Sequence, residues 1–377
     1  MKSIEIFAGV GGLGMGLHGA GFQPICVVER DRWCCDTISE NKKRGVIAVK
    51  RWKLIAGDIR NVDLCEFKGK VALLSGGPPC QPFSMGGKHL AYDDDRDMFP
   101  HAIRAVRQTS PKAFIFENVR GLTRINFRNY FEYIRLQMTY PEIEVRREES
   151  WTDHLARLES HHMSGSRSGL VYRLVTKVVD AADYGIPQRR HRVFFVGFRD
   201  DTNVDWHFPS PTHCAESLEW DKAHGDYWDR HKVANKDRLF GLSPSQVRPE
   251  LLPWLSVRDA ISDLPDPEKS PLLAATIHNH RFQPGARSYP GHTGSHLDGP
   301  AKAIKSGVHG VPGGENMILR PNGAVRYFTV RESARLQTFP DDFVFHGAWS
   351  ESMRQLGNAV PVELARFVGE SIARRID

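Results

Sequence analysis

A glycine-rich loop near the N-terminus constrains the fold more than any other feature of this sequence. The loop Phe7–Gly14 (FAGVGGLG) follows the apolar run Ser3–Ala8 and precedes a helical pattern through Leu17. Glycines let the backbone approach a ligand closely, and the N-terminus of a helix presents unpaired N–H groups. This arrangement is typical of nucleotide-binding α/β sheets.

The alternation of strand and helix continues to about residue 120. Apolar runs stand at Pro24–Glu29, Leu54–Ile55, Val71–Ser75 and Ala113–Glu117, with helical patterns at Trp33–Asn41 and Met98–Thr109. Strands that alternate with helices imply right-handed crossovers and a parallel sheet covered on both faces. Strand patterns return at Leu170–Val179 and Val193–Gly197, whereas residues 121–170 look less regular. We therefore predict an α/β, Rossmann-like fold.

The length of the chain and its local composition indicate more than one domain. The chain has 377 residues, and a domain takes roughly 150. Residues 201–325 hold nine of the 17 histidines, are rich in Pro and Gly, and show little periodicity. We predict a catalytic and cofactor-binding domain over 1–200 and a smaller, loop-rich domain over 201–325. Helical patterns resume at Thr329–Gln337 and Val362–Ile376.

Composition excludes several classes of protein. A hydrophobic share of 40% and a charged share of 25% are ordinary for a globular protein. No apolar run is long enough for a membrane helix, and the first residues lack a signal-peptide pattern, so a soluble, cytoplasmic protein without a membrane partner is expected. The six cysteines form no C-x-x-C pair, which predicts reduced thiols and no metal site.

The positive charge lies in the first part of the chain. Residues 1–200 hold 31 Lys and Arg against 23 Asp and Glu, whereas residues 201–325 have a net charge of −2. A basic protein suits a polyanionic partner such as nucleic acid. Many cytosolic enzymes are mildly basic for other reasons, so charge alone does not decide the partner.

Two acids could complete a nucleoside site beside the loop. Gly9, Gly11 and Gly14 satisfy G-x-G-x-x-G, and Glu29 stands 20 residues beyond Gly9, where a carboxylate can accept ribose hydroxyls. Asp58 ends the next apolar segment at the same edge of the sheet. These residues favour a nucleoside-containing cofactor over an ordinary turn, but they leave NAD possible.

Cys80 is the candidate nucleophile. It lies in Gly76–Ser84 (GGPPCQPFS), directly after a buried strand, where open α/β sheets place their ligands. A cysteine thiolate is strongly nucleophilic, and the prolines beside Cys80 stiffen its turn. Cys26 and Cys65 are interpreted instead as small buried apolar residues.

Two further motifs add an acid and a basic strand edge. Glu117 closes the run AFIF, where partial burial could let it hold a proton, although strand-end acids are common. In Gln188–Arg192 (QRRHR), alternation places Arg190 and Arg192 on one face and Arg189 and His191 on the other. A solvated basic edge would explain the second motif about equally well.

Together these motifs resemble the DNA (cytosine-5)-methyltransferases, in particular the prokaryotic restriction-modification type. The segments FAGVGG, GGPPCQPFS, ENV, YGIPQRRHR, YFTVRESARLQTFP and QLGNAVPV occur in the family's order. The resemblance covers roughly residues 1–120, 170–200 and 326–377. It implies an S-adenosylmethionine-dependent sheet, a target-recognition domain at 201–325 and a C-terminal segment, 326–377, that returns to the catalytic domain. Residues 140–170 look like an insertion.

The resemblance also implies a mechanism. Cys80 would add to C6 of a cytosine flipped out of duplex DNA, so that C5 can attack the methyl donor. Glu117 would bind N3, Arg192 the base carbonyl and Arg190 the base or backbone nearby. Residues 84–97 resemble the loop that closes over DNA, and the base that removes the C5 proton is not identified.

The cofactor site follows by resemblance as well. Its expected residues are Phe7, Gly9, Gly11, Gly12, Glu29, Arg30, Asp58, Ile59, Pro79, Met98, Asn358 and Val360. The family often has an aromatic residue at position 30, so adenine stacking would rely here on the guanidinium plane of Arg30 or on other residues.

Three alternatives stay open. A tRNA-acting branch shares this fold and its motifs, although the long segment 201–325 favours duplex DNA. A catalytically silent DNA-binding protein would have lost Cys80 or Glu117, and both are intact. An NAD dehydrogenase would explain only the glycine loop. We further expect a monomer whose biological partner is an endonuclease acting on the same site, without direct contact.

Overall fold

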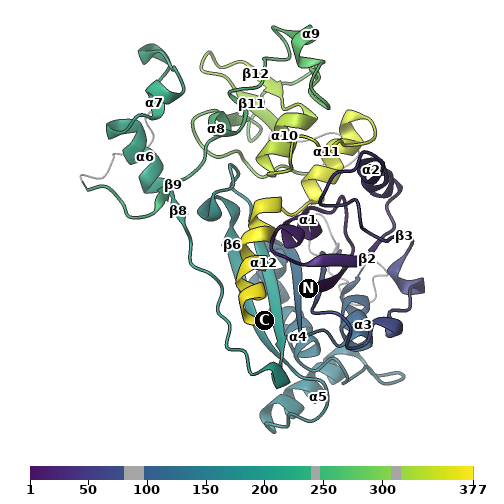
Figure 1. Cartoon of the computed structure of the whole chain (residues 1–377). Coiled ribbons are helices and arrows are strands. Elements are labelled where there is room, and N and C mark those ends of the chain that lie inside the picture. Colours follow the sequence, from purple (N-terminus) through teal and green to yellow (C-terminus); the bar gives the residue numbers. More distant parts are fainter. Residues whose placement is uncertain (80–96, 239–246, 307–315, 377) are drawn as a thin grey trace.

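A seven-stranded sheet forms the centre of the molecule (Figure 1). The computed structural model describes residues 1–79, 97–238, 247–306 and 316–376. The strand order is β3-β2-β1-β4-β5-β7-β6. Its strands are β1 (Lys2–Ile6), β2 (Gln23–Glu29), β3 (Leu54–Ala56), β4 (Leu73–Gly76), β5 (Ala113–Val119), β6 (Tyr172–Asp180) and β7 (His191–Arg199).

The sheet is parallel from β1 to β5, as predicted, but β7 departs from that expectation. It pairs antiparallel with both β5 and β6. Residues 181–190 join β6 to β7 through one 3-10 turn, and a parallel crossover needs a dozen or more residues. The short connection therefore reverses the chain and makes the sheet mixed.

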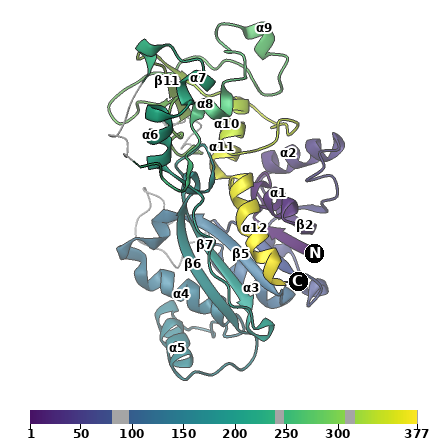
Figure 2. The ribbon, with the colours of Figure 1, turned by 60° about the vertical axis from the view of Figure 1, so that its left-hand side comes forward.

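Helices cover both faces of the sheet (Figure 2). α1 (Gly12–Gly19) and α12 (Val362–Ile376) share a core with β4, β5 and β7, whereas α3 (Phe99–Thr109) and α4 (Arg128–Thr139) pack on the opposite face. A Cβ at Gly16 would lie 2.5 Å from Cβ of Ala365, so glycine allows α1 and α12 to approach closely. The C-terminal helix thus returns to the N-terminal sheet. In the described ranges, none of the helices is both long and apolar enough to cross a bilayer.

Residues 121–170 contain more regular structure than the sequence led us to expect. They form α4 and α5 (Trp151–Met163), which pack together, and the Tyr133 hydroxyl lies 2.9 Å from Nδ1 of the buried His154. Buried residues of α4, such as Tyr130 and Ile134, recur at a helical spacing that we overlooked. In both views α5 lies at the end of the molecule opposite the loop-rich unit (Figures 1 and 2).

The region after residue 212 consists of short elements joined by long connections. They are β8 (His213–Cys214), α6 (Ala215–His224), α7 (Tyr227–Arg230), β9 (Leu252–Pro253), α8 (Val257–Ile261), α9 (Pro271–Ala274), β10 (Ser295–His296), β11 (Met317–Leu319) and β12 (Val325–Tyr327). α10 (Val330–Leu336), α11 (Trp349–Asn358) and α2 (Arg32–Lys43) complete the helices.

The loop-rich unit begins later in the chain than the expected domain boundary at residue 201. Trp206 is buried, its ring lies 5.9 Å from that of Phe198 in β7, and its Nε1 donates to Ser371 of α12. Residues 201–212 therefore run along the seven-stranded sheet, and the loop-rich unit begins near His213.

Two thiols differ from each other in burial. Cys26 lies in β2 and is buried, as predicted, and burial raises the pKa of its thiol to about 11. Cys65 is exposed, so its interpretation as a buried apolar residue was wrong. It begins a 3-10 turn after the buried Leu64, which takes the apolar position in its place.

Candidate active site

The glycine loop leaves β1 in a backbone conformation that favours glycine. Gly9 has φ +56° and Gly11 has φ +87°, and Phe7 also has a positive φ, at 53°. A Cβ at Gly11 would lie 2.4 Å from the buried Trp52 ring, so the loop is held against that ring. Among the described residues, none beyond the chain neighbours of Gly9 has an atom within 4 Å of a Cβ built there. The loop therefore presents its backbone to open space, as a ligand cradle requires.

Glu29 ties the loop to the end of β2. Its Oε2 accepts from the Gly9 N–H at 2.7 Å, and its Oε1 accepts from the N–H groups of Arg30 and Asp31 at 2.8 and 2.7 Å. Burial raises the pKa of this carboxyl, and the three N–H donors oppose that shift. A carboxylate has about four acceptor sites, so about one stays free for a ligand hydroxyl.

Arg30 and Asp58 meet beside Glu29. Arg30 Nη1 lies 3.2 Å from Asp58 Oδ2, and 57% of the Arg30 side chain is exposed. Arg60 also bonds Asp58, which lowers the pKa of that carboxyl and keeps it ionised. Ile59 follows Asp58 and is buried. The ion pair holds an exposed guanidinium plane next to Glu29.

The remaining expected cofactor residues lie on three other segments. The Met98 N–H donates to the Pro79 carbonyl at 3.3 Å, and the Met98 side chain is buried. A Cβ at Gly12 would lie 2.3 Å from the Val360 carbonyl oxygen, which brings the segment after α11 to the glycine loop. Asn358, the last residue of α11, is exposed. The fold thus joins residues that are about 350 positions apart in the sequence.

The ENV segment holds the turn that leads to the candidate nucleophile. The Asn118 side chain donates from Nδ2 to the Pro78 carbonyl at 2.8 Å and accepts from the Val119 N–H through Oδ1. Pro78 stands two residues before Cys80. Cys80 and residues 84–96 of the expected closing loop lie outside the described residues. Asn118, which sequence analysis did not single out, therefore fixes the backbone that enters the Cys80 turn.

Glu117 and Arg192 form a buried ion pair beside that turn. Arg192 Nε lies 2.6 Å from Glu117 Oε1, at an angle that leaves this oxygen without a hydrogen bond. A Cβ at Gly77 would lie 3.6 Å from Glu117 Oε2, so the carboxyl faces the GGPP segment. Burial raises the pKa of Glu117, and Arg192 only partly offsets it. The site combines a carboxyl that can hold a proton with a cation next to it.

Arg190 departs from its expected role, a contact with the base or the backbone nearby. It is fully buried, and its guanidinium donates to three backbone carbonyls, those of Ile304, Gly357 and Ala359. These donors are therefore committed to joining β7 to residues 304 and 357–359. Arg190 positions the segment around Asn358 and Val360 instead of facing a ligand.

The other face of the QRRHR segment follows the predicted alternation. Arg189 Nε donates to Asp180 Oδ2, and His191 Nε2 lies 3.5 Å from the same oxygen. The Arg189 guanidinium also lies over the Trp254 ring, 4.6 Å from its centroid. These contacts connect the seven-stranded sheet to the loop-rich unit and lie on the other face of the segment from Arg192.

Replacing Arg190 with methionine is expected to lower the free energy of unfolding by about 3–5 kcal/mol, because three buried carbonyls lose their donor, at about 1–3 kcal/mol each. Urea unfolding measures this loss. A direct base contact would predict the opposite pattern, in which Arg190→Met keeps its stability and loses only the rate of methyl transfer. Arg374→Met, at an exposed arginine of α12, is the matched control.

Glu5 is a buried acid that sequence analysis missed, although a single acid in an apolar strand was a signal for it. Its Oε1 accepts from the Gly14 N–H at 2.9 Å, and its Oε2 has no hydrogen-bond partner. Burial raises the pKa of Glu5 to about 8. A Cβ at Gly14 would lie 1.8 Å from this carboxyl, so Glu5 lies directly beneath the glycine loop.

Glu5 predicts a pH dependence of stability. Because its folded pKa is raised from 4.5 to about 8, its contribution is fully present below pH 4.5 and is lost as the pH rises through 8. Glu5→Gln is expected to remove this loss, on the order of 3–5 kcal/mol. Urea unfolding at pH 5, 7 and 9 checks it, with the exposed Glu66→Gln as control. Equal pH slopes for wild type and Glu5→Gln would contradict the assignment.

Comparison with known proteins gives the family. The family model for C-5 cytosine-specific DNA methylases matches residues 1–140 and 160–374. The chain belongs to this family. The gap between the two matched ranges, residues 141–159, includes the first part of α5, the helix at the far end of the molecule.

Individual relatives of this C-5 cytosine-specific DNA methylase align along nearly the whole chain. Type II methyltransferase M.PspPI of Psychrobacter sp. (strain TA137) is 30% identical over 99% of this chain and 79% of its own length. Type II methyltransferase M.NgoMIV of Neisseria gonorrhoeae is also 30% identical, over 99% and 97%. A crystal structure of a prophage-encoded protein from E. coli covers 99% of both chains, with a TM-score of 0.61 and 21% identity. That likeness concerns the fold.

Proposed function

We propose that this methylase transfers a methyl group from S-adenosylmethionine to C5 of a cytosine flipped out of duplex DNA, through a covalent bond between Cys80 and C6. The observation that carries the proposal is the Glu117–Arg192 pair beside the GGPP turn, with Asn118 holding the Pro78 carbonyl. These residues place a proton-holding carboxyl next to the segment that ends at the candidate nucleophile.

The roles follow from the chemistry of cytosine. C5 is a poor nucleophile until a thiolate adds to C6, which shifts electron density toward N3. Glu117, with its raised pKa, can donate a proton to N3 as the C6–S bond forms. Arg192 lies beside it and can donate to the base carbonyl. After methylation, loss of the C5 proton to a base expels the thiolate, and N3 returns its proton to Glu117, which restores the neutral aromatic ring.

Several residues fit S-adenosylmethionine. The open space at Gly9, the free acceptor site of Glu29 and the exposed guanidinium of Arg30 provide a cradle, a ribose contact and an adenine-stacking plane. Phe7, Gly11, Gly12, Asp58, Ile59, Pro79, Met98, Asn358 and Val360 would complete the pocket. When bound, the cofactor supplies an electrophilic methyl group.

We assign target recognition to the loop-rich residues within 201–325, and catalysis to residues 1–200 together with 326–377. A base inside a duplex cannot reach a thiol in a pocket, so the cytosine must flip, at a cost of a few kcal/mol. The net charge of −2 in 201–325 indicates that recognition there relies on a few base-edge contacts. We further propose a cytoplasmic monomer that protects DNA against an endonuclease acting on the same site.

The decisive experiment measures which nucleic acid and which atom receive the methyl group. Purified protein is incubated with labelled S-adenosylmethionine and either plasmid DNA or bulk tRNA, and bisulfite sequencing locates the product. Labelled DNA with 5-methylcytosine at one sequence motif supports the proposal. Label confined to tRNA, or methyl groups on adenine N6 or cytosine N4, would overturn it.

A further inference from the structure

An exposed, strongly basic segment follows Glu117 directly. Residues 119–130 (VRGLTRINFRNY) contain three arginines, Arg120, Arg124 and Arg128, and no Asp or Glu. All three arginines are exposed, and within the described part of the chain none of them pairs with an acid. Ile125 between them is 78% exposed, so the described residues leave this surface uncovered. We call Arg120, Arg124 and Arg128 the arginine strip.

The segment that carries the arginine strip is anchored in the core of the sheet. It follows β5 through two 3-10 turns, Arg120–Thr123 and Ile125–Phe127, and Arg128 begins α4. Leu122 and Tyr130 are buried in the core of the sheet and fix both ends of this segment. The first turn of α4 contains no acidic residue, so no carboxylate there opposes the positive charge.

The strip begins next to the candidate active site. In the β5–β7 pair, Val119 is opposite Arg192, and Arg120 is the next residue. Paired Cα atoms are about 5.5 Å apart at most, and neighbouring Cα atoms 3.8 Å, so the Cα of Arg120 lies within ~9 Å of the Cα of Arg192. From Arg120 to Arg128 the chain extends roughly 16–18 Å, at a rise of about 2 Å per residue in the 3-10 turns and about 3.3 Å at the extended Arg124. That length matches about five phosphates of one strand.

We propose that the arginine strip binds the phosphate backbone of duplex DNA beside the flipped cytosine. This inference rests on the proposed function, because it assigns a surface for the same substrate. An arginine side chain can form bidentate hydrogen bonds with the oxygens of a phosphate. Because the guanidinium groups of the strip have no acidic partner in the described part of the chain, no ion pair has to break before they bind phosphate. Phosphate contacts carry no sequence information, so the strip holds any sequence equally and leaves recognition to other residues.

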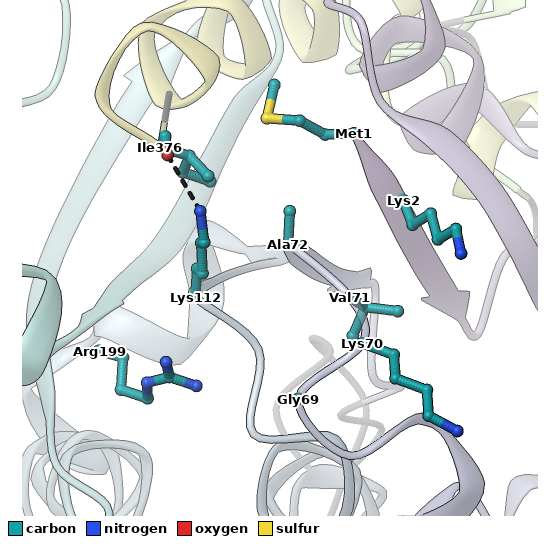
Figure 3. A pocket seen from close by; sticks show the side chains of 9 residues that line it. All are labelled: Met1, Lys2, Gly69, Lys70, Val71, Ala72, Lys112, Arg199 and Ile376. Carbon is teal, nitrogen blue, oxygen red and sulfur yellow. Dashed lines mark hydrogen bonds between the residues drawn. The ribbon is translucent and has the colours of Figure 1, made fainter.

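The test compares two triple variants with the same change in charge. Arg120→Gln/Arg124→Gln/Arg128→Gln removes the strip. Lys2→Gln/Lys68→Gln/Lys70→Gln removes three exposed lysines at the opposite edge of the sheet, where β1 and β4 begin. Lys2 and Lys70 line a cavity of about 440 Å³ there, together with Lys112 and Arg199 (Figure 3).

The readout is the affinity for duplex DNA as a function of salt. Each phosphate contact contributes about 0.9 to the slope of log K against log [salt], so the strip variant is expected to lose roughly 2–3 from that slope. Its KM for DNA should rise about 10- to 100-fold, equally for target and non-target DNA, with kcat and S-adenosylmethionine affinity unchanged. A triple Arg→Lys variant should retain most of the slope.

Two results would overturn the proposal that the arginine strip binds the DNA backbone. One is a strip variant with the wild-type salt slope and KM, and the other is an equal loss in the lysine control, which would indicate general charge attraction. Thermal melting of each variant identifies any folding defect, and if the triple variant is unfolded, the single changes Arg120→Gln, Arg124→Gln and Arg128→Gln should each lose about 0.9 from the slope. If the wild-type protein methylates cytosine in DNA while the strip variant behaves normally, only this inference fails and the proposed function stands.

Discussion

Cys80→Ser is expected to abolish methyl transfer, by on the order of 10⁴-fold or more, and to leave binding of S-adenosylmethionine unchanged. A serine hydroxyl is far less acidic than a thiol and a weaker nucleophile, so addition to C6 stops. Cofactor binding survives because Gly9, Glu29 and Asp58 lie on other segments. Filter binding or calorimetry with S-adenosylmethionine, next to an assay for labelled DNA, separates the two effects.

Trapping the covalent bond gives an independent check on Cys80. DNA with 5-fluorocytosine at the target position should form a complex that survives denaturing electrophoresis, because fluorine at C5 cannot be removed as a proton. The same DNA should not trap Cys80→Ser. Cys26→Ser is the matched control, since that thiol is buried in β2 and should not affect trapping. Wild-type protein that turns over normal DNA but never traps would contradict the covalent route.

Glu117→Gln is expected to lower kcat by about 10²- to 10⁴-fold, with a smaller effect on the KM for DNA. Glutamine can still donate a hydrogen bond to N3 but cannot transfer a proton to it. Because burial raises the pKa of Glu117, the acid form is available at higher pH than for an ordinary carboxyl, and activity should fall as the pH rises through that pKa. This falling limb should be absent from the pH profile of the Gln variant.

The pH profile distinguishes a proton donor from a structural acid. If Glu117 only held Arg192 in place, Glu117→Gln would shift stability or KM and would keep the shape of the wild-type kcat profile. Glu117→Asp is the second variant, since it keeps an acid in a shorter side chain. Partial recovery of both kcat and the falling limb in that variant would support proton transfer.

Most of the sheet was predictable because local patterns determine its strands. Continuous apolar runs identified β2, β4 and β5, and the helical pattern at Val362–Ile376 matches α12 in its bounds. The direction of β7 was not predictable from a pattern, because alternation looks the same in parallel and antiparallel strands. The length of the β6–β7 connection decided it. α4 was missed because its buried face mixes Tyr130, Tyr133 and Gln137 with three apolar residues, so the apolar spacing is weak.

The residues of the candidate site likewise fall into those that the sequence could predict and those that only the structure revealed. Glu29 and Glu117 could be selected from the sequence because each stands at the end of a strand, and strand ends meet at one edge of the sheet. The role of Arg190 could not, because its partners are backbone carbonyls that are 114 to 169 residues away. Asn118 and Glu5 likewise depend on contacts with Pro78 and Gly14, which no local pattern encodes.

The sequence by itself determined the α/β class and the chemistry, since motif order and residue type suffice to name a thiol, a carboxyl and a glycine loop. Only the tertiary structure decided which of two neighbouring arginines faces Glu117 and which supports the backbone. It also decided that the three arginines after β5 lie beside the site. The physical reason is that burial and charge pairing depend on distances between segments remote in sequence, whereas periodicity reports only each segment's own exposure.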